Sequence, residues 1–148
     1  MRRVLALVAL ALALGLPARA AAQSPLQVFV ADVARLWAAG DADALVALAP
    51  ADGRIVLDVG EGSAGPVGRR QAAAALRDVF GGRTTLAVRA ERATVSGGDP
   101  VSGFGELRWE SRPRGVTTAE RGVVFVGVVW DGRAWRIREL RGVPAGVA

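Results

Sequence analysis

The fold of this chain is decided by the stretch VTTAERGVVFVGVVWDGRAWRIREL, residues 116–140. Two apolar runs flank the pair Asp131-Gly132. Asp-Gly between such runs is a strong signal for a β-hairpin with a two-residue turn, because both turn residues need positive φ. That turn pairs Trp130 with Arg133 and sets the register of the strands behind it. The register places one set of side chains on a common face, with Arg136 and Arg138 on the opposite face: Val126, Val128, Trp135 and Ile137.

More strands are predicted upstream of this hairpin. Residues 84–95 alternate, with Leu86, Val88 and Ala90 on one side. Residues 101–112 alternate as well, so that Leu107 and Trp109 lie opposite Glu106, Arg108 and Glu110. The segment RIVLDV, residues 54–59, predicts a short strand, and residues 61–68 read as a glycine-rich loop. Long strands joined by tight turns indicate an antiparallel meander.

Three helices are predicted before the long strands. Residues 25–39 carry an apolar stripe at helical spacing, and Gly40 ends them. Asp41 is placed to cap a short helix over residues 42–49. The alanine-rich residues 69–80 predict a third helix, which Gly81 and Gly82 terminate. The fold class is therefore α+β, with N-terminal helices covering one face of a curved antiparallel sheet.

The first residues have the pattern of a signal peptide. A basic start, Arg2-Arg3, precedes an apolar run over residues 4–16, which Pro17 and small residues follow. The apolar run is too short for an ordinary membrane span, which needs about 20 residues. No cysteine follows it, so lipid anchoring at a cysteine is excluded. We expect a signal peptide over residues 1–22, one domain over residues 23–142 and a tail over residues 143–148. The mature chain is then exported, periplasmic or secreted, with no membrane attachment after cleavage.

Charge argues against a nucleic-acid partner. The 19 basic residues are all Arg, and without Arg2, Arg3 and Arg19 the net charge falls to +2. A nucleic-acid footprint needs a clustered basic surface, and these charges are dispersed along the chain.

Three segments carry a resemblance to a known family: GDADALVALAPADGRIVLDV (residues 40–59), GRRQAAAALRDVF (68–80) and VVWDGRAWRIREL (128–140). With the leading helix, this order resembles the nuclear transport factor 2-like (SnoaL-like) superfamily, and in particular its small exported bacterial members of unknown function. The resemblance implies a cone-shaped α+β fold, a mouth able to hold a small ligand, and a homodimer formed through the sheet.

The composition removes most catalytic chemistry. The chain has no His, Cys, Lys, Tyr or Asn. Nucleophile–His pairs, Schiff-base chemistry and ordinary zinc sites are thereby excluded, and we expect no metal and no cofactor. The resemblance implies that enzymes of this superfamily use Tyr, His or Asn beside an Asp. This chain lacks all three residue types, so the sequence argues against an enzyme.

Asp58 is the catalytic candidate that remains. In an apolar cavity its pKa would rise and it could act as a base. The alternation of RIVLDV instead groups Asp58 with Val56, opposite Ile55 and Leu57, which favours a solvent-facing carboxylate.

The ligand-binding candidates are aromatic and basic: Trp37, Trp109, Trp135 and Arg108. Tryptophans could stack on a ligand, but they also fill cores. Arg108 lies between Glu106 and Glu110, which favours salt bridges on a solvated face over an acid–base pair in the cone. Phe80, Phe104 and Phe125 are core candidates.

Three functions stay open at this stage. The leading one is a non-catalytic exported domain that binds a small apolar ligand or a protein partner, including itself. The second is an enzyme that uses only Asp and Arg, similar to the isomerases, cyclases or epoxide hydrolases of the superfamily. The third is a structural module that packs by its sheet in an envelope assembly.

Overall fold

The structure is a computed structural model that describes residues 18–60 and 65–144, with side chains over residues 25–60 and 65–142. The expected signal peptide falls largely outside the described residues. The elements run in the order α1 (Ala18–Ala39), α2 (Ala42–Ala47), β1 (Arg54–Asp58), β2 (Gly65–Gly68), α3 (Arg69–Gly81), β3 (Arg83–Gly97), β4 (Ser102–Pro113), β5 (Glu120–Trp130) and β6 (Trp135–Pro144).

The strands form one six-stranded sheet in the order β2-β1-β6-β5-β4-β3. The long strands make the expected antiparallel meander, but the sheet is mixed, because β1 runs parallel to β6. The predicted loop over residues 61–68 is wrong in its second half. Residues 65–68 form β2, where Val67 pairs with Ile55. The sequence Gly-Pro-Val-Gly has no alternating apolar pattern, so nothing in it indicated a strand.

The β5–β6 hairpin keeps the predicted faces but not the predicted register. Trp130 pairs with Trp135 instead of Arg133, and Val128 pairs with Ile137. Asp131 is the reason, because its carboxylate accepts hydrogen bonds from the backbone N–H of Arg133 and of Ala134, both at 2.8 Å. These bonds favour a four-residue loop over the two-residue turn. A slip of two residues leaves every side chain on its face.

Three irregularities in β3 change which of its side chains face the core. The register shifts between Thr85 and Ala87, between Ala90 and Arg92, and between Val95 and Gly97. Leu86, which the alternation groups with Val88 and Ala90, lies at the first shift and is 45% exposed. Thr85 faces Trp109 instead. Bulges of this kind interrupt the alternation of side chains between the two faces of a strand, and a prediction from the sequence pattern assumes that this alternation is unbroken.

The helices follow the sequence closely. Asp41 caps α2 by accepting a hydrogen bond from the backbone N–H of Ala44, and α3 spans the predicted residues with one more. The helix α1 begins at Ala18, seven residues before the predicted start, and carries Pro25 inside it. Alanine-rich residues ahead of Pro25 favour this extension. The expected domain boundary at residue 22 thus falls within α1. No described helix has the length and apolar character needed to cross a membrane.

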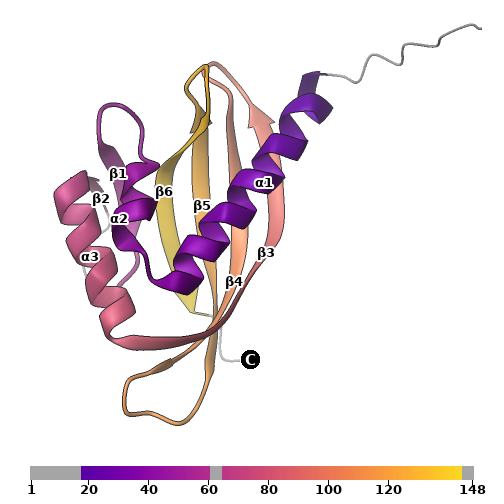
Figure 1. Cartoon of the computed structure of the whole chain (residues 1–148). Coiled ribbons are helices and arrows are strands. Elements are labelled where there is room, and N and C mark those ends of the chain that lie inside the picture. The colour runs from indigo at the N-terminus through magenta and orange to yellow at the C-terminus, as the bar shows by residue number, and fades with distance from the viewer. Residues whose placement is uncertain (1–17, 61–64, 145–148) are drawn as a thin grey trace, which may run out of the picture.

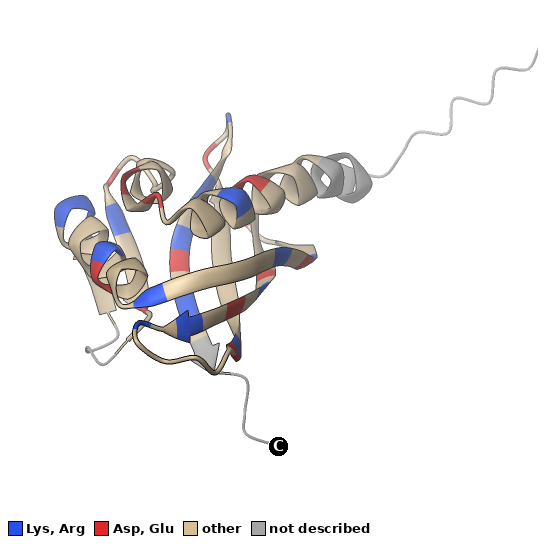
Figure 2. Cartoon of the chain, turned by 60° about the horizontal axis from the view of Figure 1, so that its bottom comes forward, with Lys and Arg blue, Asp and Glu red and all other residues tan. Residues whose placement is uncertain are grey.

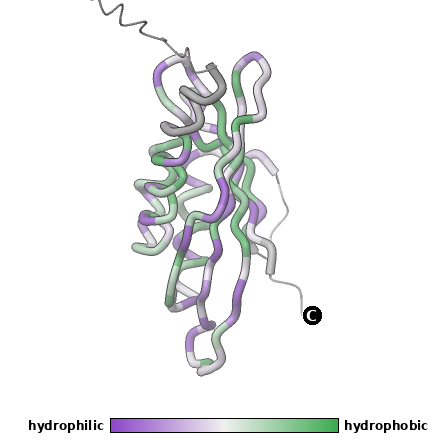
Figure 3. The backbone as a smooth tube through the Cα atoms, turned by 90° about the vertical axis from the view of Figure 1, so that its right-hand side faces the viewer, coloured by the Kyte–Doolittle hydropathy of each residue, from purple (hydrophilic) through white to green (hydrophobic). Residues whose placement is uncertain are grey.

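The architecture has two layers. Seen edge-on in Figure 3, the helices lie on one side of the sheet, and Figure 1 shows α1 crossing the sheet diagonally over β3 and β4, with α2 and α3 beside it. The expected α+β fold with helices on one face is confirmed. The core fills the space between the layers with fully buried side chains from both: Leu26, Val30, Val33, Trp37, Leu45, Ile55, Leu76, Leu107, Val124, Val126, Ile137 and Leu140.

Candidate functional site

An aromatic cluster lies under the C-terminal end of α1, where the helices meet the sheet. Trp37 is fully buried there and makes edge-to-face contacts with Phe80, at 5.0 Å between ring centroids, and with Trp109, at 5.3 Å. The indole N–H of Trp109 donates a hydrogen bond to Thr85 Oγ1 at 3.0 Å. Three elements, α1, α3 and β4, therefore each contribute one ring to a packed cluster.

Arg83 covers this cluster from the start of β3. Its guanidinium lies 5.7 Å from the centroid of Trp109, in cation–π range, and donates a hydrogen bond to Ser111 Oγ at 3.0 Å. It also forms an ion pair with Glu120 at 2.8 Å. Ser111 is buried, with 2% of its surface exposed. Arg83 thus bridges the ring of Trp109, the hydroxyl of Ser111 and the carboxylate of Glu120.

Two indole groups on the helix side of the sheet are buried without a partner. Among the described residues, the Nε1 atoms of Trp37 and Trp135 have no hydrogen-bond partner. Trp135 belongs to a separate pair, because its ring packs edge-to-face on Trp130 at 5.5 Å. A buried N–H without a partner costs about 1–3 kcal/mol. Both groups are therefore donors that an acceptor would stabilise.

The other face of the sheet carries an apolar strip. The pairing of β4 with β5 places Phe104, Phe125 and Val123 on this outer face, opposite the buried Leu107 and Val124. All three are half-buried, although no described helix covers this side of the sheet (Figure 3). Phe104 and Phe125 were expected in the core, and this expectation is wrong. The same alternation that buried Leu107 could have placed them outside, since Phe104 is three residues away from it.

Ion pairs frame the apolar strip on both sides. Toward β3, Arg108 pairs with Glu91 at 2.9 Å, and Arg92 lies 3.9 Å from Glu106. Toward β1, Arg141 lies 3.8 Å from Asp58 and 2.5 Å from Glu139. Figure 2 shows the acidic and basic positions interspersed along the strands instead of gathered by sign. The outer face therefore carries three apolar side chains, with charged side chains of both signs directly beside them, since Glu106 pairs with Phe125 and Arg108 with Val123.

The predicted site residues do not converge on one place. Asp58 ends β1 on the outer face, half-buried and beside Arg141, while Ile55 and Leu57 are buried, as the alternation predicted. Arg108 also points to the outer face. Trp37 and Trp109 meet in the aromatic cluster defined above, and Trp135 lies apart from them with Trp130.

The described residues hold no group of three or more His, Cys, Asp or Glu side chains that could bind a metal ion. One carboxyl group, Asp131, has a pKa well below its ordinary value. The hydrogen bond from Arg136 lowers this pKa to about 2, helped by the backbone N–H groups of Ala134 and Arg133. The same hydrogen bonds hold the β5–β6 loop in its conformation. The lowered pKa of Asp131 therefore reflects a structural role of this carboxylate.

Comparison with solved structures identifies the fold. The chain resembles a ketosteroid isomerase-like protein from Erwinia carotovora atroseptica, with a TM-score of 0.65 at 15% identity over 84% of this chain and 96% of that one. A DUF4783 family protein from Bacteroides uniformis matches with a TM-score of 0.61 at 12% identity, over 77% of this chain and 94% of that one. A nuclear transport factor 2-like protein with a cystatin-like fold from Novosphingobium aromaticivorans matches with a TM-score of 0.59 at 17% identity, over 88% and 87%.

No family model matches the sequence, and no curated protein matches it. The structural likenesses confirm the resemblance to the nuclear transport factor 2-like superfamily at the level of the fold. At sequence identities this low, the likeness to solved structures shows a shared fold and nothing about function.

Proposed function

We propose that this chain is an exported, non-catalytic nuclear transport factor 2-like domain that works by binding protein through the outer face of its sheet. The first partner is a second copy of the chain. The observation that carries the proposal is the apolar strip of Phe104, Phe125 and Val123 on a face that no described element covers.

The strip offers the aromatic side chains of an interface centre, with charged residues next to them. Aromatic side chains are enriched at the centres of protein interfaces, and charged residues are depleted there and found at the rim. Phe125 pairs across the strands with Glu106, and Phe104 with Gly127, so the two rings are diagonal neighbours on adjacent strands. The ion pairs at the margins supply the polar rim.

The charge pattern favours a second copy over a partner of one sign. A symmetric dimer brings the same patch of both subunits together, so the patch has to complement itself. The outer face satisfies this condition, because acidic and basic side chains lie on both sides of the strip. A strongly acidic or basic partner would meet no surface of opposite electrostatic potential there.

Sedimentation of the mature chain over a dilution series tests the proposal. We expect a monomer–dimer equilibrium that Phe125→Glu shifts to monomer, since the variant places a charge in the desolvated centre of the interface. Val28→Glu is the matched control, because Val28 is 62% exposed on α1 and lies on the opposite layer. If Phe125→Glu and Val28→Glu have equal dimer dissociation constants, the outer face is not the dimer interface.

A second candidate function is the binding of a small apolar ligand on the helix side of the sheet. It is favoured by the unpartnered indole N–H of Trp37 inside the aromatic cluster, to which a ligand carbonyl or hydroxyl could bind. A native mass spectrum of the mature chain from an exporting host tests it. An excess mass that is lost on heating supports the ligand, and a clean mass in native and denaturing spectra alike contradicts it.

The catalytic alternative depends on Asp58. Asp58 lies 3.8 Å from Arg141 at the outer margin of the sheet, and 41% of its side chain is exposed, which supports a solvent-facing carboxylate over a buried base. We expect Asp58→Asn to leave both ligand binding and the cellular phenotype unchanged. If Asp58→Asn abolishes the cellular function while the fold and the dimer are unchanged, Asp58 is a catalytic group.

Export is part of the proposal and is supported by the pattern of residues 1–22. We expect the chain expressed with its own N-terminus to appear outside the cytoplasm without residues 1–22 or a closely similar segment. Sequencing of the mature N-terminus from fractionated cells measures this directly. An intact Met1 in the cytoplasmic fraction would contradict it.

A further inference from the structure

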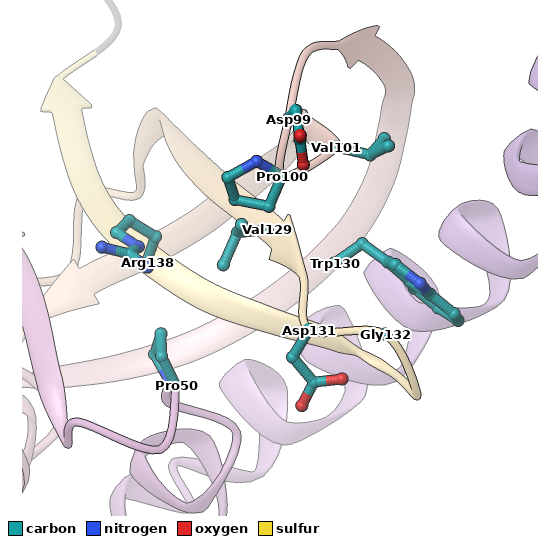
Figure 4. Close-up of a pocket in the computed structure, with 9 residues that line it drawn as sticks. All are labelled: Pro50, Asp99, Pro100, Val101, Val129, Trp130, Asp131, Gly132 and Arg138. Carbon is teal, nitrogen blue, oxygen red and sulfur yellow. The ribbon is translucent and has the colours of Figure 1, made fainter.

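A pocket of about 450 Å³ opens at the end of the sheet where two strand connections meet. The β3–β4 turn contributes Asp99 and Pro100, and the β5–β6 loop contributes Asp131 and Gly132 (Figure 4). The two connections are tied together, since the backbone N–H of Trp130 donates to the carbonyl oxygen of Val101 at 2.8 Å. Five of its nine lining residues are exposed, Asp99 and Arg138 among them, so the pocket is an open surface depression.

The floor of the pocket is apolar and rigid. Pro50, Pro100 and Val129 line it from three separate segments. Val129 is only 9% exposed, although it belongs to the outer face of β5. Two prolines and a buried β-branched side chain have little rotamer freedom to lose, so the floor is ready for an apolar group.

Arg138 supplies a free positive charge at the pocket. It is the extra residue of β6, because Val128 pairs with Ile137 while Gly127 pairs with Glu139. Bulges re-aim side chains out of the regular alternation. Arg138 lines the pocket as a result, and it makes no ion pair or side-chain hydrogen bond with any described residue. Its neighbours Arg136 and Arg141 are both paired with carboxylates.

Asp99 supplies a free negative charge at the same pocket. Its carboxylate also makes no hydrogen bond or ion pair within the described part of the chain. The other carboxylate at the pocket, Asp131, is already satisfied by Arg136 at 2.8 Å and by two backbone N–H groups. The pocket therefore presents one available cation and one available anion beside an apolar floor.

We propose that this pocket binds a short zwitterionic peptide with apolar side chains. Arg138 receives the terminal carboxylate, for which a guanidinium is well suited, and Asp99 receives the terminal ammonium. The apolar side chains lie on Pro50, Pro100 and Val129. The site lies apart from the aromatic cluster, but Val129 is a diagonal neighbour of Phe104 on the outer face, so the pocket adjoins the proposed dimer interface.

Calorimetric titration of the mature chain with leucyl-leucine tests the proposal. The amidated dipeptide lacks the carboxylate, and the N-acetylated dipeptide lacks the ammonium. We expect saturable binding of leucyl-leucine and about tenfold weaker binding of each blocked form, the effect of losing one charge-assisted hydrogen bond. Absence of saturable binding at millimolar dipeptide would overturn the site.

Two variants assign the charges. Arg138→Gln is expected to bind leucyl-leucine and its amide equally, and Asp99→Asn to bind leucyl-leucine and its N-acetyl form equally. Arg133→Gln and Asp78→Asn are matched controls, because both residues are exposed and neither lines the pocket. If the ammonium makes no difference in the unaltered chain, the ligand is a simple carboxylate and the zwitterion proposal is wrong. If the control variants lose as much affinity for leucyl-leucine as the pocket variants do, the dipeptide does not bind at this pocket.

Discussion

Val30 of α1 lies directly against Gly105 of β4. A methyl group at Gly105 would come within 2.7 Å of Val30 Cγ2 and 2.8 Å of its Cγ1, closer than non-bonded carbon atoms approach. Gly103, two residues earlier on the same face, allows the same approach, since a methyl group there would lie 3.1 Å from Leu26 Cδ2. These two glycines let α1 pack close to the sheet.

Gly105→Ala should therefore destabilise the fold. The expected loss in the free energy of unfolding is about 1–3 kcal/mol, the usual cost of overpacking a core. Urea unfolding followed by tryptophan fluorescence measures it. The control is Gly65→Ala in β2, where a methyl group would meet nothing within 4 Å.

The Val30→Ala/Gly105→Ala pair separates this contact from a general loss of stability. Val30→Ala makes room for the new methyl group, so the double variant should be more stable than the sum of the single effects predicts. Strict additivity would mean that Val30 and Gly105 do not limit each other.

Trp37 should be the side chain whose truncation costs most in the aromatic cluster. It is fully buried between Phe80 and Trp109, so Trp37→Ala removes two ring contacts and leaves a cavity. The expected loss is about 3–5 kcal/mol in the free energy of unfolding. Val28→Ala, on the exposed side of α1, is the control and should change stability by less than about 0.5 kcal/mol. A small effect of Trp37→Ala in thermal or urea unfolding would show that the cluster is loosely packed.

Stability in acid should depend on Asp131. Its pKa in the folded chain is about 2, below the ordinary 3.8, so its contribution is fully present above about pH 4 and is lost as the pH falls toward 2. Arg136→Gln removes the main cause and brings the pKa back toward the ordinary value. We expect this variant to have a lower Tm at neutral pH and a shallower fall of Tm between about pH 4 and pH 2.

Arg133→Gln is the matched control for that experiment. Arg133 lies on the same loop, but it contacts Asp131 through its backbone N–H, which the substitution keeps. Its Tm profile should follow that of the unaltered chain. Identical profiles for all three proteins would contradict the role given to Arg136.

Local signals in the sequence were sufficient for much of the fold. Asp41 was placed correctly as a helix cap, because a carboxylate before a short apolar run satisfies the first backbone N–H groups. The alternation of RIVLDV correctly placed Ile55 and Leu57 inside and Asp58 outside. These features depend on neighbours a few residues apart, which a sequence displays directly.

Features that depend on distant partners were missed. The register beyond Asp131 slipped by two residues, because such a slip leaves every face unchanged and only the loop hydrogen bonds decide it. The parallel pairing of β1 with β6 joins segments about eighty residues apart and leaves no local mark. The sequence predicts Phe104 and Phe125 in the core, whereas both lie on the outer face, because the side that the helices cover leaves no local mark in the sequence.

The central claim is that the outer face of the sheet joins two copies of this chain, and the molar mass of the unaltered mature chain tests it most directly. Light scattering coupled to size-exclusion chromatography should give twice the chain mass at high concentration and a fall toward the single mass on dilution. A single chain mass at every concentration would contradict this dimer, and Phe104, Phe125 and Val123 would then be a half-buried apolar strip that no second copy covers.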